Sequence, residues 1–152
     1  MKDTLNLLTH NQWSGTEYLS DITGFAVYNS SNVLRETSNI WSENGENSLK
    51  ITKLKENSFW VRAYSQNEIH CKTITGEVTI RTTNSSVKVY LLEIQNGITI
   101  QGSTVTVPAN TVANINLSLF SGDANTSVAI HVGIVGDVGD ICYIDNLQLF
   151  SS

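Results

Sequence analysis

The chain has 152 residues, of which 15% are charged and 40% are hydrophobic, and its formal net charge is −5. This length fits one domain over residues 1–152 and is enough to bury a substantial core. The acidic balance, without a run of Lys or Arg, argues against nucleic acid as a partner, and no apolar stretch is long enough for membrane insertion as a helix.

The N-terminus, from Met1 to Leu5, lacks the apolar core of a signal peptide. The low share of charged residues is made up by Ser, Thr and Asn, which is typical of strand-rich domains on a cell surface, on a virion surface or outside the cell. We expect such a location. The two cysteines, Cys71 and Cys142, are interpreted as buried thiols, and a disulfide stays open if their strands are neighbours.

Short strands separated by turn residues follow one another along the chain. We expect them at Asn6–Leu8, Phe25–Tyr28, Val33–Arg35, Ser48–Thr52, Phe59–Tyr64, Ile69–Thr75, Glu77–Thr83, Val87–Ile94, Ser103–Val107, Ile115–Phe120, Val128–Ile134 and Ile141–Phe150. Turns are expected between them, among others at Gly76 and at Asn96-Gly97. No segment keeps a helical period, so the pattern predicts an all-β sandwich or barrel.

The strand Phe59–Tyr64 has two different faces. Phe59, Val61 and Ala63 alternate with Trp60, Arg62 and Tyr64, and the first set is an adequate core face. Two aromatic planes and a guanidinium on the other face suit a sugar, because its C–H face packs on aromatic rings and its hydroxyls accept from planar donors. The alternative is an aromatic face covered by the N-terminal loop, with Arg62 in a salt bridge.

Four further residues are candidates for the same binding face. Lys88 and Tyr90 alternate with Val87 and Val89, although Leu92 breaks the pattern. His131 stands between the small Ala129 and Gly133, an arrangement that leaves room above the sheet. Trp41 precedes a polar loop and is either a rim aromatic or a residue that fixes the loop to the core.

The later strands carry inner faces of alternating apolar residues. Ile115, Leu117 and Leu119 form one such face, and Val128, Ile130, Val132 and Ile134 form another. In the closing strand, Tyr143, Asp145, Leu147 and Leu149 share one parity, which predicts a core face. Asp145 would then be a carboxylate among apolar groups, and it has to be paired, hydrogen-bonded or bound to a metal.

Three fragments in this order resemble the jelly-roll carbohydrate-binding modules of the family four, nine and twenty-two group and their galactose-binding-like fold. They are Asn6-Leu7-Leu8 with Trp13 shortly after, Gly45-Glu46-Asn47-Ser48-Leu49-Lys50-Ile51, and Tyr143-Ile144-Asp145-Asn146-Leu147-Gln148-Leu149. The resemblance frames nearly the whole chain. It implies a jelly roll of two antiparallel sheets with the first and last strands close together.

The resemblance also implies one structural Ca²⁺, with the Asp of the closing strand, here Asp145, as a ligand. The carboxylate that the family commonly has after its first strand is replaced here by Thr9-His10-Asn11-Gln12. Calcium affinity rises with the number of charged oxygen ligands, so Glu46 is the residue that would compensate. The alternative for Asp145 is a carboxylate that accepts hydrogen bonds from backbone amides where two strands meet.

No catalytic motif is present: the three histidines lack metal-ligand spacing, and no nucleophile elbow or phosphate-binding loop occurs. We therefore expect a non-catalytic module that binds an oligo- or polysaccharide as an accessory or surface domain of a larger protein. The alternative is a structural or adhesion domain of a cell-surface or phage-tail protein that makes protein contacts.

Overall fold

The computed structural model describes the backbone of residues 5–6, 25–28, 33–43, 48–55, 60–64, 72–121 and 127–151. Side chains are described for residues 34, 36, 38–43, 48–55, 73–120 and 128–147. In this part of the chain, no helix has the length and apolar character needed to cross a membrane.

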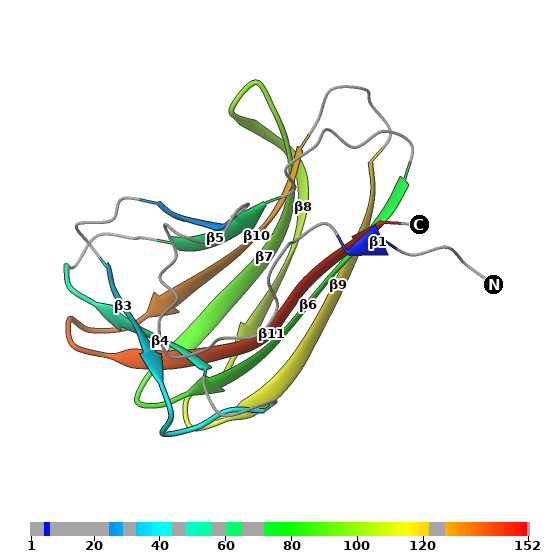
Figure 1. The fold of residues 1–152 in the computed structure, drawn as a ribbon. Helices are drawn as coiled ribbons and strands as arrows, with labels where there is room; N and C mark the ends of the chain where they lie inside the picture. The colour runs from blue at the N-terminus through cyan, green and yellow to red at the C-terminus, as the bar shows by residue number, and fades with distance from the viewer. Residues whose placement is uncertain are drawn as a thin grey trace.

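The regular structure described is a set of β-strands (Figure 1). They are β1 (Leu5–Asn6), β2 (Phe25–Tyr28), β3 (Val33–Ser38), β4 (Ser48–Lys53), β5 (Trp60–Tyr64), β6 (Lys72–Thr82), β7 (Ser86–Gln95), β8 (Ile98–Val107), β9 (Val112–Ser121), β10 (Ser127–Val135) and β11 (Ile141–Ser151). The predicted all-β class is confirmed.

The strands form two antiparallel sheets that face each other (Figure 1). One has the order β3-β4-β11-β6-β9, with β1 added to β11, and the other has the order β2-β5-β10-β7-β8. The closing strand β11 pairs with β1 through Leu5–Ser151 and Asn6–Phe150. The two-sheet sandwich and the contact between first and last strands are therefore both confirmed.

The core lies between the sheets and comes from the faces that alternation predicts. In β10 the four residues Val128, Ile130, Val132 and Ile134 are buried, and they oppose buried residues of the other sheet such as Leu49 of β4. Leu119 of β9 is buried, and Ile115 and Leu117 pack against this cluster. The hairpin between β7 and β8 turns at Asn96 and Gly97, whose φ angles of 53° and 77° are those of a tight hairpin turn.

The predicted turn at Gly76 is wrong. β6 runs without interruption from Lys72 to Thr82, and Gly76 lies in its middle, paired with Leu149 on one side and Leu117 on the other. Gly often marks a turn, but an interior strand with a partner on each side holds its backbone extended through such a position. The two predicted strands around Gly76 are thus one long central strand.

The predicted face of Asp145 is also wrong, because β11 contains a β-bulge. The pairing with β6 shifts register between Asp145 and Gln148, and Asn146 has a φ of 51°. An extra residue in one strand reverses the alternation beyond it. Cys142 and Ile144 therefore face the core before the bulge and Leu147 faces it afterwards, while Asp145 lies on the opposite face. The side chain of Leu149 lies outside the described set.

Cys142 is a free, buried thiol, in agreement with the interpretation as a buried thiol rather than as half of a disulfide. It contributes to the core beside Ile144, on the strand that pairs with β4. Burial raises the pKa of Cys142 to about 12, because a thiolate would lose its hydration there. Cys71 lies outside the described residues.

Candidate functional site

The strand β5 lies inside the five-stranded sheet, between β2 and β10. Val61 and Ala63 are paired with Val132 and Ile130, which face the core. Directly paired residues share a face of the sheet. The register therefore gives positions 60, 62 and 64 to the outer face, in agreement with the predicted alternation, although the side chains of Trp60, Arg62 and Tyr64 are not among those described.

The neighbouring strands bring two of the other candidates into line with β5. His131 of β10 is paired with Arg62 on one side and with Tyr90 of β7 on the other. Strands are about 4.8 Å apart, so this row of three positions spans roughly 10 Å across the sheet. Trp60 and Tyr64 extend the same face by roughly 13 Å along β5. Residues that are distant in sequence thus share one surface.

Lys88 lies two residues from Tyr90 along β7, opposite Gly133. The side chains of Lys88, Tyr90 and His131 are all partly exposed, and each alternates with a buried core residue. The free space expected beside His131 is absent, because Ala129 and Gly133 are both buried. Leu92 and Lys88 lie directly across from these two small residues on β7.

Trp41 does not belong to this face. Its ring lies 6.3 Å from the ring of Tyr143, at an interplanar angle of 56°, and Tyr143 is on the outer face of the other sheet. The Trp41 carbonyl accepts a hydrogen bond from Ser48 Oγ, which ties the connection between β3 and β4 to the start of β4. Both contacts favour the alternative given above, in which Trp41 fixes the loop.

Asp145 is completely buried and binds backbone amides. Its Oδ2 accepts from the Glu43 N–H at 2.9 Å, and its Oδ1 accepts from the Asn146 N–H at 2.9 Å. The described residues contain no group of three or more His, Cys, Asp or Glu side chains that would hold a metal ion. A carboxylate oxygen has a second lone pair, so Asp145 can still serve as one calcium ligand. Glu46 lies outside the described residues, and the calcium ion stays a prediction.

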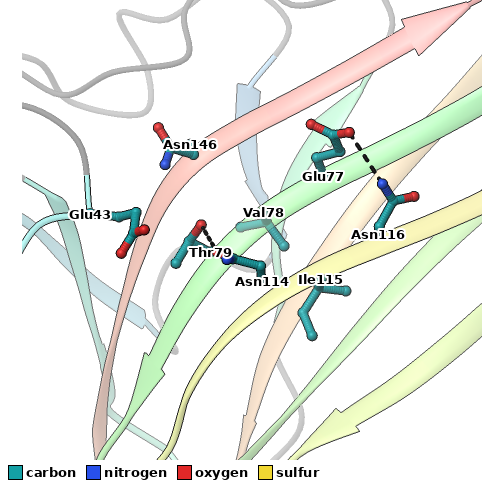
Figure 2. A pocket seen from close by; sticks show the side chains of 8 residues that line it. All are labelled: Glu43, Glu77, Val78, Thr79, Asn114, Ile115, Asn116 and Asn146. Carbon is teal, nitrogen blue, oxygen red and sulfur yellow. Dashed lines mark hydrogen bonds between the residues drawn. The ribbon is translucent and has the colours of Figure 1, made fainter.

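Residues that the alternation missed form a polar pocket on the outer face of the six-stranded sheet (Figure 2). Thr79, Asn114 and Asn116 alternate with core residues, which by itself indicates only a solvent-facing side. The repeat Asn114-Ile115-Asn116 was the available signal, because it places two amides on one face of one strand.

No protein-family model matches the sequence, and neither does any curated protein. Solved structures match at the level of the fold. A CBM61 module in complex with β-1,4-galactotriose has a TM-score of 0.69 at 19% identity, with 97% of this chain and 99% of that chain covered. The CBM22-1 xylan-binding domain of Paenibacillus barcinonensis Xyn10C has a TM-score of 0.70 at 14% identity, with coverages of 99% and 97%.

The same fold occurs within longer chains. The enzymatically active domain of tailspike protein 4 of bacteriophage CBA120 has a TM-score of 0.68 at 12% identity, and the match covers 91% of this chain but 21% of that one. The chain also spans 26% of an arabinose-bound α-L-arabinofuranosidase. These likenesses confirm the jelly-roll fold that the resemblance implies.

Proposed function

We propose that this chain is a non-catalytic module that binds an oligo- or polysaccharide on the outer face of the β2-β5-β10-β7-β8 sheet. The observation that carries the proposal is the register, which aligns Arg62, His131 and Tyr90 across three adjacent strands on the side away from the core. The module acts as an accessory or surface domain, outside the cell, on a cell surface or on a virion surface.

The residue types on this face suit a neutral sugar chain. Aromatic planes at Trp60, Tyr64 and Tyr90 pack against the C–H faces of sugar rings. Arg62, His131 and Lys88 supply hydrogen-bond donors to the hydroxyls between them. The span of β5 accommodates more than one sugar unit, so a chain is a better ligand than a single ring.

The full-length matches support this proposal through their ligands. The structure of one is a complex with β-1,4-galactotriose, and the other is called a xylan-binding domain. We therefore take xylan, galactan and their oligosaccharides as the first ligands to test.

The test replaces Trp60 with Ala and measures binding on a glycan array and by calorimetry with the best ligand found. Removing a stacking platform should weaken binding at least tenfold and leave the melting temperature nearly unchanged. If Trp60 were a core residue instead, truncation would cost about 3–5 kcal/mol and lower the melting temperature by many degrees. A folded variant that binds as the wild type does would contradict the proposal.

Phe120→Ala is the matched control. Phe120 is an aromatic residue that is 58% exposed on β9, at the edge of the other sheet. Its truncation should change neither binding to the β5 face nor stability by a large amount. Incubation of the wild type with its bound polysaccharide should release no reducing sugar ends, since the proposed role is binding alone.

The second candidate function is a structural or adhesion domain that makes protein contacts. The likeness to part of a phage tailspike chain favours it, because that match shares the fold within a much longer protein. The two functions differ in their ligand: a chain that binds no sugar on the array but associates stably with a protein partner through the β5 face would support this alternative.

A further inference from the structure

The outer face of the six-stranded sheet carries a pocket of about 380 Å³, on the opposite side of the sandwich from the β5 face. Figure 2 shows its polar side chains on three adjacent strands and on the segment after β3. They are Glu43, Glu77, Thr79, Asn114, Asn116 and Asn146. The volume lies at the lower end of the range of roughly 300–1,000 Å³ found for small-molecule sites.

The pairing of β6 with its two neighbours creates this pocket. Thr79 lies between Asp145 of β11 and Asn114 of β9, and Glu77 lies between Gln148 and Asn116. The β-bulge separates these two rows on the β11 side, where Asn146 takes its left-handed conformation. Bulges bend a strand away from its partner and redirect side chains. The pocket is therefore bounded by the bulge rather than by a loop alone.

Two hydrogen bonds hold the polar groups in place. Thr79 Oγ1 donates to Asn114 Oδ1 at 2.6 Å, and Asn116 Nδ2 donates to Glu77 Oε1 at 3.2 Å (Figure 2). Thr79 is buried and so fixes one amide firmly. Both asparagines keep unused capacity, with Asn114 Nδ2 as a donor and Asn116 Oδ1 as an acceptor. Asn146 and Glu43 add an amide and a carboxylate whose side chains make no hydrogen bond to a described residue.

Such a set of groups matches adjacent sugar hydroxyls, each of which donates and accepts at once. The carboxylates Glu43 and Glu77, with no cation among the described residues that line the pocket, disfavour uronic acids and other anionic sugars. The part of its lining that the structure describes contains no aromatic residue, so recognition there would depend on hydrogen bonds rather than stacking. We propose that this pocket is a second carbohydrate site, which binds one or two neutral sugar units independently of the β5 face.

The test uses the Trp60→Ala chain, in which the β5 face is disabled, as well as the wild type. Each is ¹⁵N-labelled and titrated by NMR with D-xylose, D-galactose, xylobiose and β-1,4-galactobiose. The proposal expects saturable shifts of the side-chain amides of Asn114, Asn116 and Asn146 in both chains. Glucuronic acid at the same concentrations should leave these signals in place.

Two substitutions remove groups from the pocket without exposing the core. Asn116→Ala and Glu77→Gln should each lower the affinity of the pocket at least fivefold, because Asn116 is exposed and Glu77 lies on the same side of the sheet. Asn84→Ala, at an exposed asparagine between β6 and β7, is the matched control and should leave the affinity unchanged.

The outcomes separate this site from the proposed function. Loss of all sugar-induced shifts in the Trp60→Ala chain would overturn the second site while supporting the β5 face. Shifts of the Asn114 and Asn146 side-chain amides that persist in that chain, and whose affinity falls at least fivefold when Asn116→Ala is added to it, would support the pocket even if the β5 face bound nothing. Shifts of the Asn114 and Asn146 side-chain amides that saturate at unchanged affinity after both pocket substitutions in the Trp60→Ala chain would overturn the assignment, because the sugar would then bind elsewhere.

Discussion

Asp145 carries a completely buried carboxylate whose two oxygens both accept backbone amide hydrogens. Replacing it with Asn keeps the size but turns one acceptor into a donor that faces another donor. A buried donor left without a partner costs about 1–3 kcal/mol, and more where a charged group is lost. We expect Asp145→Asn to lower the free energy of unfolding by at least this amount in urea titrations. Asp137→Asn, at an exposed carboxylate, is the control and should have little effect.

The same variant tests the predicted calcium ion. An ion that binds only the folded state raises its stability with ion concentration. The wild type should then melt at a higher temperature in excess Ca²⁺ than in a chelator, and Asp145→Asn should lose this difference. Equal melting temperatures of the wild type in Ca²⁺ and in chelator would contradict an exchangeable ion with Asp145 as a ligand.

Cys142 makes stability depend on pH in the alkaline range. Burial raises its pKa from the ordinary 9.0 to about 12 in the fold, so above pH 9 the unfolded state loses a proton that the folded state keeps. The stabilisation by the neutral thiol is therefore complete below pH 9 and is lost as the pH rises from about 9 to 12. In this window we expect the free energy of unfolding of the wild type to fall by about 1.4 kcal/mol per pH unit more than that of Cys142→Ala. The free energy of unfolding of both proteins is measured by urea titration at each pH, and an equal fall with pH in the two would contradict this prediction.

At the scale of the element, alternation identifies a face wherever a strand is regular. It assigned β10 and β9 correctly, because Val128–Ile134 and Ile115–Leu119 keep a strict period of two. It also agreed with the register of β5, since Val61 and Ala63 pair with core residues of β10. These are positions at which the local sequence alone decides which side is apolar.

Alternation fails where the backbone departs from the period. In β11 the shared parity of Tyr143, Leu147 and Leu149 predicts a regular strand, although the strand contains a bulge. Asn146 is only a weak signal for the bulge, because Asn tolerates a positive φ in many other settings. The local sequence around Gly76 favours a turn, because the two strand partners that hold Gly76 extended are distant in sequence. The place of Trp41 depends on the path of the connection between β3 and β4, which no pattern within the segment determines.

The polar pocket was missed for a related reason. Its residues come from β6, β9, β11 and the segment after β3, and each of them taken alone resembles an ordinary solvent-facing side chain. Only the strand order places Thr79 beside Asn114 and Glu77 beside Asn116. A constellation across strands thus needs the topology, whereas a pattern within a single strand, such as the alternation of Trp60–Tyr64, can be found from its own sequence.

For the whole molecule, β11 is the strand on which the six-stranded sheet depends. It pairs with β4 and β6 on its two sides, and with β1 near its end. It also contributes Cys142, Ile144 and Leu147 to the core. Large apolar side chains contribute about 1.5–3 kcal/mol each on burial, so their sum is comparable with the whole stability of a typical domain, about 5–15 kcal/mol.

A chain that ends at Gly139 should therefore not fold. Without β11, the facing edges of β4 and β6 have no partner, and unpaired edges of this kind invite aggregation. We expect the truncated chain to show no cooperative thermal transition by circular dichroism. The full-length variant Leu147→Ala provides an intermediate step: it removes one core side chain at a cost of about 2–5 kcal/mol and should still unfold cooperatively, with a melting temperature lower by roughly 4–20 °C. A truncated chain that melts cooperatively at the wild-type temperature would show that the remaining strands form the core without β11.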